Sequence, residues 1–199
     1  MLQLIELMGV IVFAVSGIVE AKRKRLDLVG IFVVAFITAF GGGTLRDLLL
    51  DRTPLFWVQH EWYLALIMVL AVVSIPLREL GEIEARHLLI PDAIGLGLFS
   101  ITGAGYALEA GTGWLAAAVM GVITGTWGGV FRDIIINEIP FVFRNTYLYA
   151  TSAFVGCWIF IILSNLGVSE TMAVSVGTIC IAGIRIASLR WNIRLPGGH

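Results

Sequence analysis

Long apolar runs separated by short polar connections dominate the pattern of hydrophobic and polar positions along this chain. A helix that crosses a bilayer needs about 20 mostly apolar residues, with a range of about 17 to 25. On that template the sequence predicts seven membrane spans, at residues 2–20, 28–46, 61–79, 88–107, 114–132, 147–165 and 169–189. The connections are too short to hold a soluble domain. We therefore expect an all-α integral membrane protein formed by one membrane domain, residues 1–199.

Composition agrees with this class. Hydrophobic residues make up 58% of the chain and charged residues 14%, whereas soluble domains carry about 25% charged residues. With a net charge of −1 and no basic patch interleaved with aromatic residues, the chain is not expected to bind nucleic acid. Its two cysteines lie in separate apolar runs without metal-ligand spacing, and no nucleophile–base pair is present. We expect neither an enzyme nor a cofactor or metal site.

Basic residues alternate between the connections, and this alternation predicts the orientation because cytoplasmic loops carry an excess of Lys and Arg. The first connection holds Lys22, Arg23, Lys24 and Arg25, the third Arg78 and Arg86, the fifth Arg144, and the tail Arg190 and Arg194. The second holds Arg52, and the fourth and sixth hold none. Seven spans then place the N-terminus outside and the C-terminus in the cytoplasm. Residues 22–25 are also a candidate site for anionic lipid headgroups.

An internal repeat becomes visible when the sequence is shifted by 86 residues, which aligns Gly43 with Gly129 (129 − 43 = 86). The shift also matches Glu6 with Asp92, Gly9 with Gly95, Ser16 with Thr102, Gly17 with Gly103, Thr38 with Thr124, Gly42 with Gly128, Arg46 with Arg132, Asp47 with Asp133 and Pro54 with Pro140. Matched polar residues are informative in a chain this apolar. They predict a duplicated three-span unit, about 2–80 and 88–166, followed by a seventh helix at about 169–189 and a short tail, 190–199. Because three is odd, the second unit enters the membrane from the opposite side, which makes an inverted-topology repeat.

A glycine run followed by Arg-Asp closes the second span of each unit. The two copies read Gly41-Gly42-Gly43-Thr44-Leu45-Arg46-Asp47 and Gly128-Gly129-Val130-Phe131-Arg132-Asp133. Each glycine inside a helix costs about 1 kcal/mol relative to alanine. We therefore expect both helices to be broken at the glycines, with the freed backbone buried in protein or lining a water-filled cavity. Close helix packing is the alternative, and it is favoured for Gly9, Gly17, Gly95 and Gly103.

Polar residues around these motifs allow two interpretations each. The hydroxyls that could line a hydrated path are those of Ser16, Thr38, Thr44, Thr102 and Thr124, although mid-membrane hydroxyls often bond their own i−4 carbonyl. Glu6 and Asp92 could attract cations at the two mouths, or could simply favour a helix dipole. Since neighbouring helix positions point about 100° apart, we expect Arg46 and Arg132 to pair with groups elsewhere, such as the other repeat. These arginines, with Asp47 and Asp133, are candidates for gating or ion pairing, and anchoring at the membrane interface is the alternative for the arginines.

The paired glycine-Arg-Asp motifs and the downstream prolines, in a layout of three spans, three spans and one, resemble the prokaryotic branch of the trimeric intracellular cation channel family. The resemblance covers residues 1–190. It implies a homotrimer in a prokaryotic inner membrane, with one pore per protomer between the two repeats. That pore would conduct monovalent cations, chiefly K⁺ but also Na⁺, and would be framed by helices kinked at Gly41–Gly43 and Gly128–Gly129. The second motif begins Trp127-Gly128-Gly129 instead of with three glycines, so we expect unequal halves.

Some bacterial relatives are labelled glycine transporters, which leaves a secondary transporter for glycine or a similar small amino acid as the alternative. The short chain and the neutral residues proposed for the pore favour a channel. The sequence holds no Thr-Val-Gly-Tyr-Gly filter, so we expect modest selectivity between K⁺ and Na⁺. An arginine near the path would repel cations, and we expect each to be ion-paired, with rearrangement of the pairs gating the path.

Overall fold

The computed structural model describes residues 1–82, 85–143 and 148–193, and within them the chain is helical without strands. Its α-helices are α1 (Leu2–Arg23), α2 (Leu28–Leu49), α3 (Phe56–Gln59), α4 (Trp62–Ser74), α5 (Ala85–Glu109), α6 (Trp114–Ile135), α7 (Ala150–Asn165) and α8 (Glu170–Arg190). Two 3₁₀ turns, η1 (Arg78–Glu82) and η2 (Phe141–Phe143), lie in connections. Arg144, Arg194 and the side chains of Arg78 and Arg86, which contributed to the predicted orientation, lie outside this description, as does the tail from residue 194.

Each predicted apolar segment contains or overlaps one apolar helix, but the helices are unequal in length, and α4 ends five residues before the predicted span 61–79 does. Five are long and apolar enough to cross a membrane: α1, α2, residues 89–109 of α5, α6 and α8. The other two apolar helices are shorter, with 13 residues in α4 and 16 in α7. At 1.5 Å per residue α4 is about 20 Å long, less than the roughly 30 Å of a hydrocarbon core. It ends at Ser74, two residues before Pro76, because a proline has no N–H to continue the helical hydrogen bonds.

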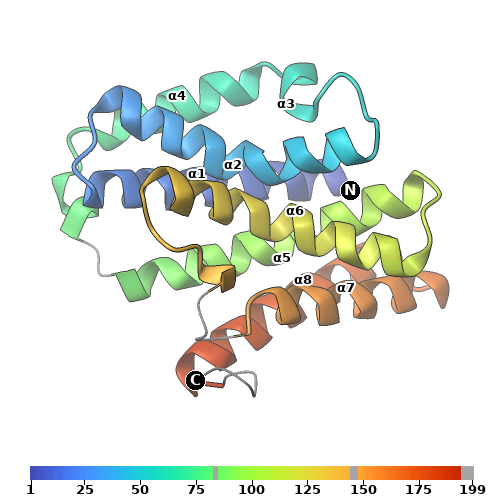
Figure 1. Cartoon of the computed structure of the whole chain (residues 1–199). Coiled ribbons are helices and arrows are strands. Elements are labelled where there is room, and N and C mark those ends of the chain that lie inside the picture. Colours follow the sequence, from blue (N-terminus) through green and yellow to red (C-terminus); the bar gives the residue numbers. More distant parts are fainter. Residues whose placement is uncertain (83–84, 144–147, 194–199) are drawn as a thin grey trace.

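The helices lie side by side along one direction, with the start of α1 at one end of the bundle and the end of α8 at the other (Figure 1). A central group is formed by α1, α2, α5 and α6, in which α1 packs on α2 and α5, and α6 packs on α2 and α5. Helix α4 covers α2 on one side, and α7 and α8 cover α5 and α6 on the other. The two helices that carry the glycine-Arg-Asp motifs therefore cross at the centre of the molecule.

Helix α2 continues without interruption through Gly41–Gly43, and α6 continues through Gly128–Gly129. The predicted breaks are therefore wrong, and close packing is the correct interpretation. A Cβ at Gly42 would clash with the carbonyl oxygen of Thr124, and one at Gly128 would clash with the carbonyl oxygen of Thr38. The absent side chains let the backbones of α2 and α6 touch, which offsets the poor helix propensity of glycine.

Packing also explains the remaining motif glycines on α2, since a Cβ at Gly41 would lie 2.7 Å from the Phe131 ring and one at Gly43 would lie 2.5 Å from the Phe56 ring. Gly129 has more room, with its nearest neighbour at 3.2 Å from such a Cβ. Glycine packing was predicted correctly in the companion helices. Gly9 and Gly95 accommodate Phe99 and Phe13, whose rings stack with centroids 5.2 Å apart, and Gly17 and Gly103 accommodate Thr38 and Thr124.

The ends of α2 and α6 have the same geometry. Asp51 and Asn137, which are 86 positions apart, both adopt left-handed backbone conformations, with φ of 53° and 59°. In both places the next N–H donates to the carbonyl oxygen of the motif aspartate, from Arg52 to Asp47 at 2.8 Å and from Glu138 to Asp133 at 2.7 Å. Such a cap satisfies carbonyls at the helix end, and it terminates each helix directly after its Arg-Asp pair.

Candidate functional site

The first ion cluster consists of Glu6, Arg46 and Asp47. The Arg46 guanidinium contacts both carboxylates, with Nη1 2.6 Å from Glu6 Oε1 and Nη2 2.7 Å from Asp47 Oδ1. Its Nε donates to Asp47 Oδ1 at 2.8 Å, and Asp47 Oδ2 accepts the backbone N–H of Phe56 at 2.8 Å. Arg46 is fully buried. Charged groups at this depth persist because each one is compensated by an opposite charge.

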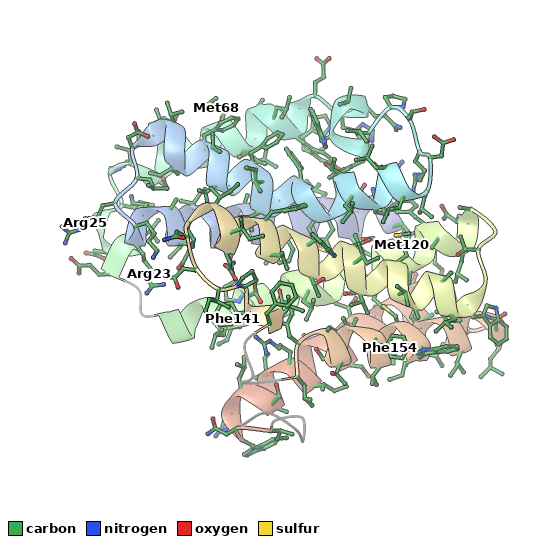
Figure 2. The ribbon with its side chains drawn as sticks, viewed as in Figure 1. Arg23, Arg25, Met68, Met120, Phe141 and Phe154 are labelled. Atoms are coloured by element: carbon green, nitrogen blue, oxygen red, sulfur yellow. The ribbon has the colours of Figure 1, made fainter. Side chains whose placement is uncertain are left out.

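The second ion cluster consists of Asp92, Arg132 and Asp133, at the positions 86 residues later. Arg132 Nη2 lies 2.8 Å from Asp133 Oδ1, and Nε donates to the same oxygen at 2.9 Å. Asp133 Oδ2 accepts the backbone N–H of Phe141, the first residue of η2, at 3.1 Å; Phe141 is labelled in Figure 2. Arg132 Nη1 is 3.4 Å from Asp92 Oδ1 and donates to Ser16 Oγ at 3.0 Å. The second cluster is therefore looser and reaches into the first half of the chain.

These contacts correct the prediction for the two arginines. Each guanidinium binds the adjacent aspartate, and it also binds the acid of the preceding long helix in its own half, which is Glu6 for Arg46 and Asp92 for Arg132. The separation of about 100° between neighbouring helix positions concerns the Cβ directions. A long arginine side chain bridges that separation. The expected ion pairing of both arginines is therefore present. Arg132 also donates to Ser16, which belongs to the first half of the chain.

Glu6 and Asp92 are not open mouth acids, because each is only 2% exposed. They also lie beyond the first turn of their helices, as the fifth residue of α1 and the eighth of α5. The helix dipole acts mainly within that turn. Both earlier interpretations of these acids are replaced by one role: they neutralise the motif arginines.

The five hydroxyls predicted to line a path are bonded within the protein. Thr38, Thr102 and Thr124 donate to carbonyl oxygens of their own helices, those of Val34 at 2.6 Å, Phe99 at 3.0 Å and Met120 at 2.8 Å. Ser16 accepts from Arg132, and Thr44 Oγ1 accepts the indole N–H of Trp57 at 3.0 Å. All except Thr44 are buried, so in this conformation they are sealed from solvent.

Among the predicted headgroup residues, Lys22 has a structural role, since its Nζ donates to the carbonyl oxygens of Ser74 and of Leu77, the latter at 3.0 Å, at the end of α4. Arg23 pairs with Glu20 at 2.8 Å, and Lys24 pairs with Glu138 at 2.6 Å. Arg25 extends from the end of the molecule in Figure 2 and remains a candidate for contact with lipid.

Sequence reasoning missed the aromatic and cationic residues around the clusters. The Arg46 guanidinium lies 4.5 Å from the Tyr106 ring centroid, and Arg185 of α8 lies 4.6 Å from that of Tyr149. A signal for Arg185 was available, because an ionisable residue inside a predicted span is a functional candidate by default. Tyr149 also matches Tyr63 under the shift of 86 residues (149 − 63 = 86).

A bundle of apolar helices with two buried ion clusters, and with glycines at its central helix crossing, defines a helical membrane protein. A family model described as "Glycine transporter" matches residues 3–79 and again residues 89–165, two segments that are also offset by 86 residues. The inner membrane protein YadS of Escherichia coli is 37% identical over 96% of this chain and 93% of its own length.

Solved structures agree with the family model. The trimeric intracellular cation channel orthologue from Rhodobacter sphaeroides superposes with a TM-score of 0.91 at 36% identity, covering 96% of this chain and 98% of that one. A structure described as the basis for conductance through TRIC cation channels gives a TM-score of 0.86 at 32% identity, covering 99% and 97%. The chain belongs to this family of trimeric intracellular cation channel (TRIC) proteins. Its family and fold neighbours are membrane channels and transporter-like proteins, not enzymes.

Proposed function

We propose that this chain forms a homotrimeric channel for monovalent cations, chiefly K⁺, with one pore in each protomer between the two repeats. The observation that carries this proposal is the pair of buried ion clusters at the ends of the crossed helices α2 and α6. The fold that holds them is also that of TRIC cation channels. The two repeats would each contribute three spans in inverted order, with the short helices α4 and α7 as their third members, and α8 would be the seventh span.

In the membrane we place the N-terminus outside and the C-terminus in the cytoplasm. Supporting this orientation, α1 begins and α8 ends at opposite ends of the bundle (Figure 1), and the basic residues 22–25 lie in the last turn of α1 and in the connection that follows it. The inner membrane is the expected location, as for the Escherichia coli relative. The first cluster would then lie toward the outside and the second toward the cytoplasm.

Conduction would require α2 and α6 to separate at their glycine contacts. In the conformation described here, the carbonyl oxygens of Thr38 and Thr124 fill the space beside Gly128 and Gly42. Paired carboxylates neutralise Arg46 and Arg132, which removes the repulsion that a free guanidinium would exert on a cation. We propose that rearrangement of these pairs accompanies opening of the path, in which the released threonine hydroxyls would become lining groups. Without a dedicated filter, the discrimination of K⁺ from Na⁺ would be modest.

A carrier for glycine or a similar small amino acid is the second candidate, because the matching family model bears the description "Glycine transporter". Chemically, arginines and carboxylates can hold the two ends of a zwitterion. Both arginines here are already bound to protein carboxylates, so a substrate would have to displace an internal ion pair. That competition favours the channel.

The test is single-channel recording of the purified protein in planar bilayers under a KCl gradient, with glycine exchange measured in parallel in liposomes. We expect discrete current steps that reverse near the K⁺ equilibrium potential, and three chains per particle by native mass spectrometry. Arg46→Ala and Arg132→Ala should each change the open probability. Silent bilayers together with glycine exchange would replace the channel by a carrier, and unaltered gating in both variants would remove the arginines from the mechanism.

A further inference from the structure

Helix α8, an element that lies outside the repeats, comes close to the second ion cluster through Tyr149. Arg185 comes from α8, is 1% exposed, and lies with its Cζ atom 4.6 Å from the centroid of the Tyr149 ring. Tyr149 directly precedes α7 and is 4% exposed. A cation held over an aromatic face in a desolvated place is an attractive contact. The contact therefore connects α8 to the start of α7.

Tyr149 in turn lies beside the acid and the arginine of the second cluster. A Cβ placed at Gly129 would be 3.2 Å from the Tyr149 hydroxyl, 3.7 Å from Asp92 Oδ1 and 3.9 Å from Arg132 Nη2. These three groups therefore surround one small space next to Gly129. Tyr149 therefore lies between Arg185 of α8 and the space that Asp92 of α5 and Arg132 of α6 also line.

Among the described contacts, none connects the first cluster to α8 in this way. Tyr63, the counterpart of Tyr149, packs against the aromatic rings of Phe40, Phe56, His60 and Trp62, with centroid distances of 4.2–6.3 Å. Glu6 and Asp92 also differ in how closely each contacts its arginine. Glu6 binds Arg46 at 2.6 Å, whereas Asp92 lies 3.4 Å from Arg132, and its buried Oδ2 has no hydrogen-bond partner among the described residues. Asp92 is the less tightly held of the two.

We infer that Arg185 and Tyr149 are positioning residues that hold the second ion cluster in its closed arrangement, so that displacement of α8 loosens the Asp92–Arg132 pair. This inference rests on the proposed function, because it assigns the regulated end of the path to the second cluster. Tyr149 occupies the space next to Asp92 Oδ1 as long as Arg185 holds its ring. When the ring is released, Asp92 can turn, and Arg132 can leave Ser16, which is its partner on α1.

The test uses a cysteine at position 16 as a reporter, in full-length protein in which Cys180 is replaced by serine. Ser16→Cys is buried next to Arg132, so its reaction with a membrane-impermeant thiol reagent, applied from the side of the C-terminus, measures opening of the second cluster. Arg185→Gln and Tyr149→Phe should raise the reaction rate about threefold to thirtyfold, the range that corresponds to one lost cation–π or hydroxyl contact. Arg185→Lys keeps the charge and should restore most of the protection.

Matched controls are available in the first half. Arg52 lies 3.8 Å from the Tyr106 ring centroid, which makes Arg52→Gln the equivalent loss of an Arg–Tyr contact, and Tyr63→Phe is the equivalent loss of a hydroxyl. Neither control should alter the rate at position 16. Tyr149→Phe retains the ring and the packing, so it remains informative if Arg185→Gln fails to fold.

The outcomes separate this inference from the proposed function. If the parent protein conducts K⁺ but the rate at position 16 and the open probability are unchanged in Tyr149→Phe and Arg185→Gln, the positioning role is wrong and the channel stands. An equal rise in the first-half controls also overturns the positioning role. If the parent protein is silent in bilayers while the rate still rises selectively, the channel proposal fails and the coupling of α8 to the second cluster stands.

Discussion

At the scale of single residues, the molecule is organised by two arginines that are kept charged in an apolar interior. Removing an ion from water costs several kcal/mol even after relaxation, and that cost is compensated only by well-placed partners. Each guanidinium meets two carboxylates, one adjacent in sequence and one 40 positions earlier. The two sets are not equivalent, because Arg46 holds its distant acid at 2.6 Å and Arg132 holds its own at 3.4 Å.

This difference predicts unequal losses of stability. Glu6→Gln breaks the tighter buried pair and should reduce the free energy of unfolding by about 3–5 kcal/mol. Asp92→Asn should cost less, because Arg132 keeps Ser16 and Asp133 as partners. Glu170→Gln is the control, since Glu170 is exposed and its contact with the N-terminus is 3.9 Å long, so about 0–1 kcal/mol is expected. Thermal unfolding in detergent measures all three, and equal losses at Glu6 and Asp92 would contradict the asymmetry.

At the scale of helices, glycine positions decide how closely α2 and α6 approach each other. Both helices keep their own hydrogen bonds through the glycines. The contact between the two backbones offsets the low helix propensity of these glycines. The central crossing is the place where the two halves of the chain pack on each other. The shorter α4 depends on a neighbour as well, because Lys22 of α1 satisfies carbonyl oxygens at its end.

Glycine-to-alanine substitutions should therefore have opposite effects at two sites. Gly42→Ala places a methyl group against the carbonyl oxygen of Thr124, and overpacking of this kind costs about 1–3 kcal/mol. At Gly183 in α8 a Cβ meets nothing within 4 Å, so Gly183→Ala should stabilise its helix by up to about 1 kcal/mol. Thermal melting of the two variants provides the comparison. A neutral Gly42→Ala would mean that α2 and α6 are not held in contact at this point.

At the scale of the whole molecule, the described residues form five long apolar helices and two shorter ones that share one direction, and α1 begins at the end of the bundle opposite to the one where α8 ends. The seven crossings that we propose, an odd number, would produce that arrangement. The alternating basic connections favour the proposed orientation over its reverse, because cytoplasmic loops carry an excess of Lys and Arg.

Orientation can be tested with cysteines in the full-length chain. Gly113→Cys lies between α5 and α6 at an exposed site where a Cβ meets nothing within 4 Å, and Leu26→Cys lies in the exposed connection between α1 and α2. In intact cells an impermeant thiol reagent should label position 113 and spare position 26. Permeabilisation should make position 26 reactive. The reverse pattern would place the basic connection outside and invert the proposed topology.

The sequence by itself determined the class of protein, the places of its apolar helices and the residues of both clusters. Apolar runs are local in sequence, and a lipid environment forces such runs to form helices. The match between Arg46 and Arg132, and between Glu6 and Asp92, was visible because duplication preserves spacing.

Only the tertiary structure decided what those residues contact. Local propensity predicted a break at Gly41–Gly43, whereas the contact of α2 with α6 stabilises an intact helix there. The acids were assigned to open mouths because their partners, 40 positions away, could not be identified without the packing of α1 on α2 and of α5 on α6. Arg185 and Tyr149 meet for the same reason. Burial and pairing depend on distances between distant parts of the chain, and those distances arise only when the helices pack.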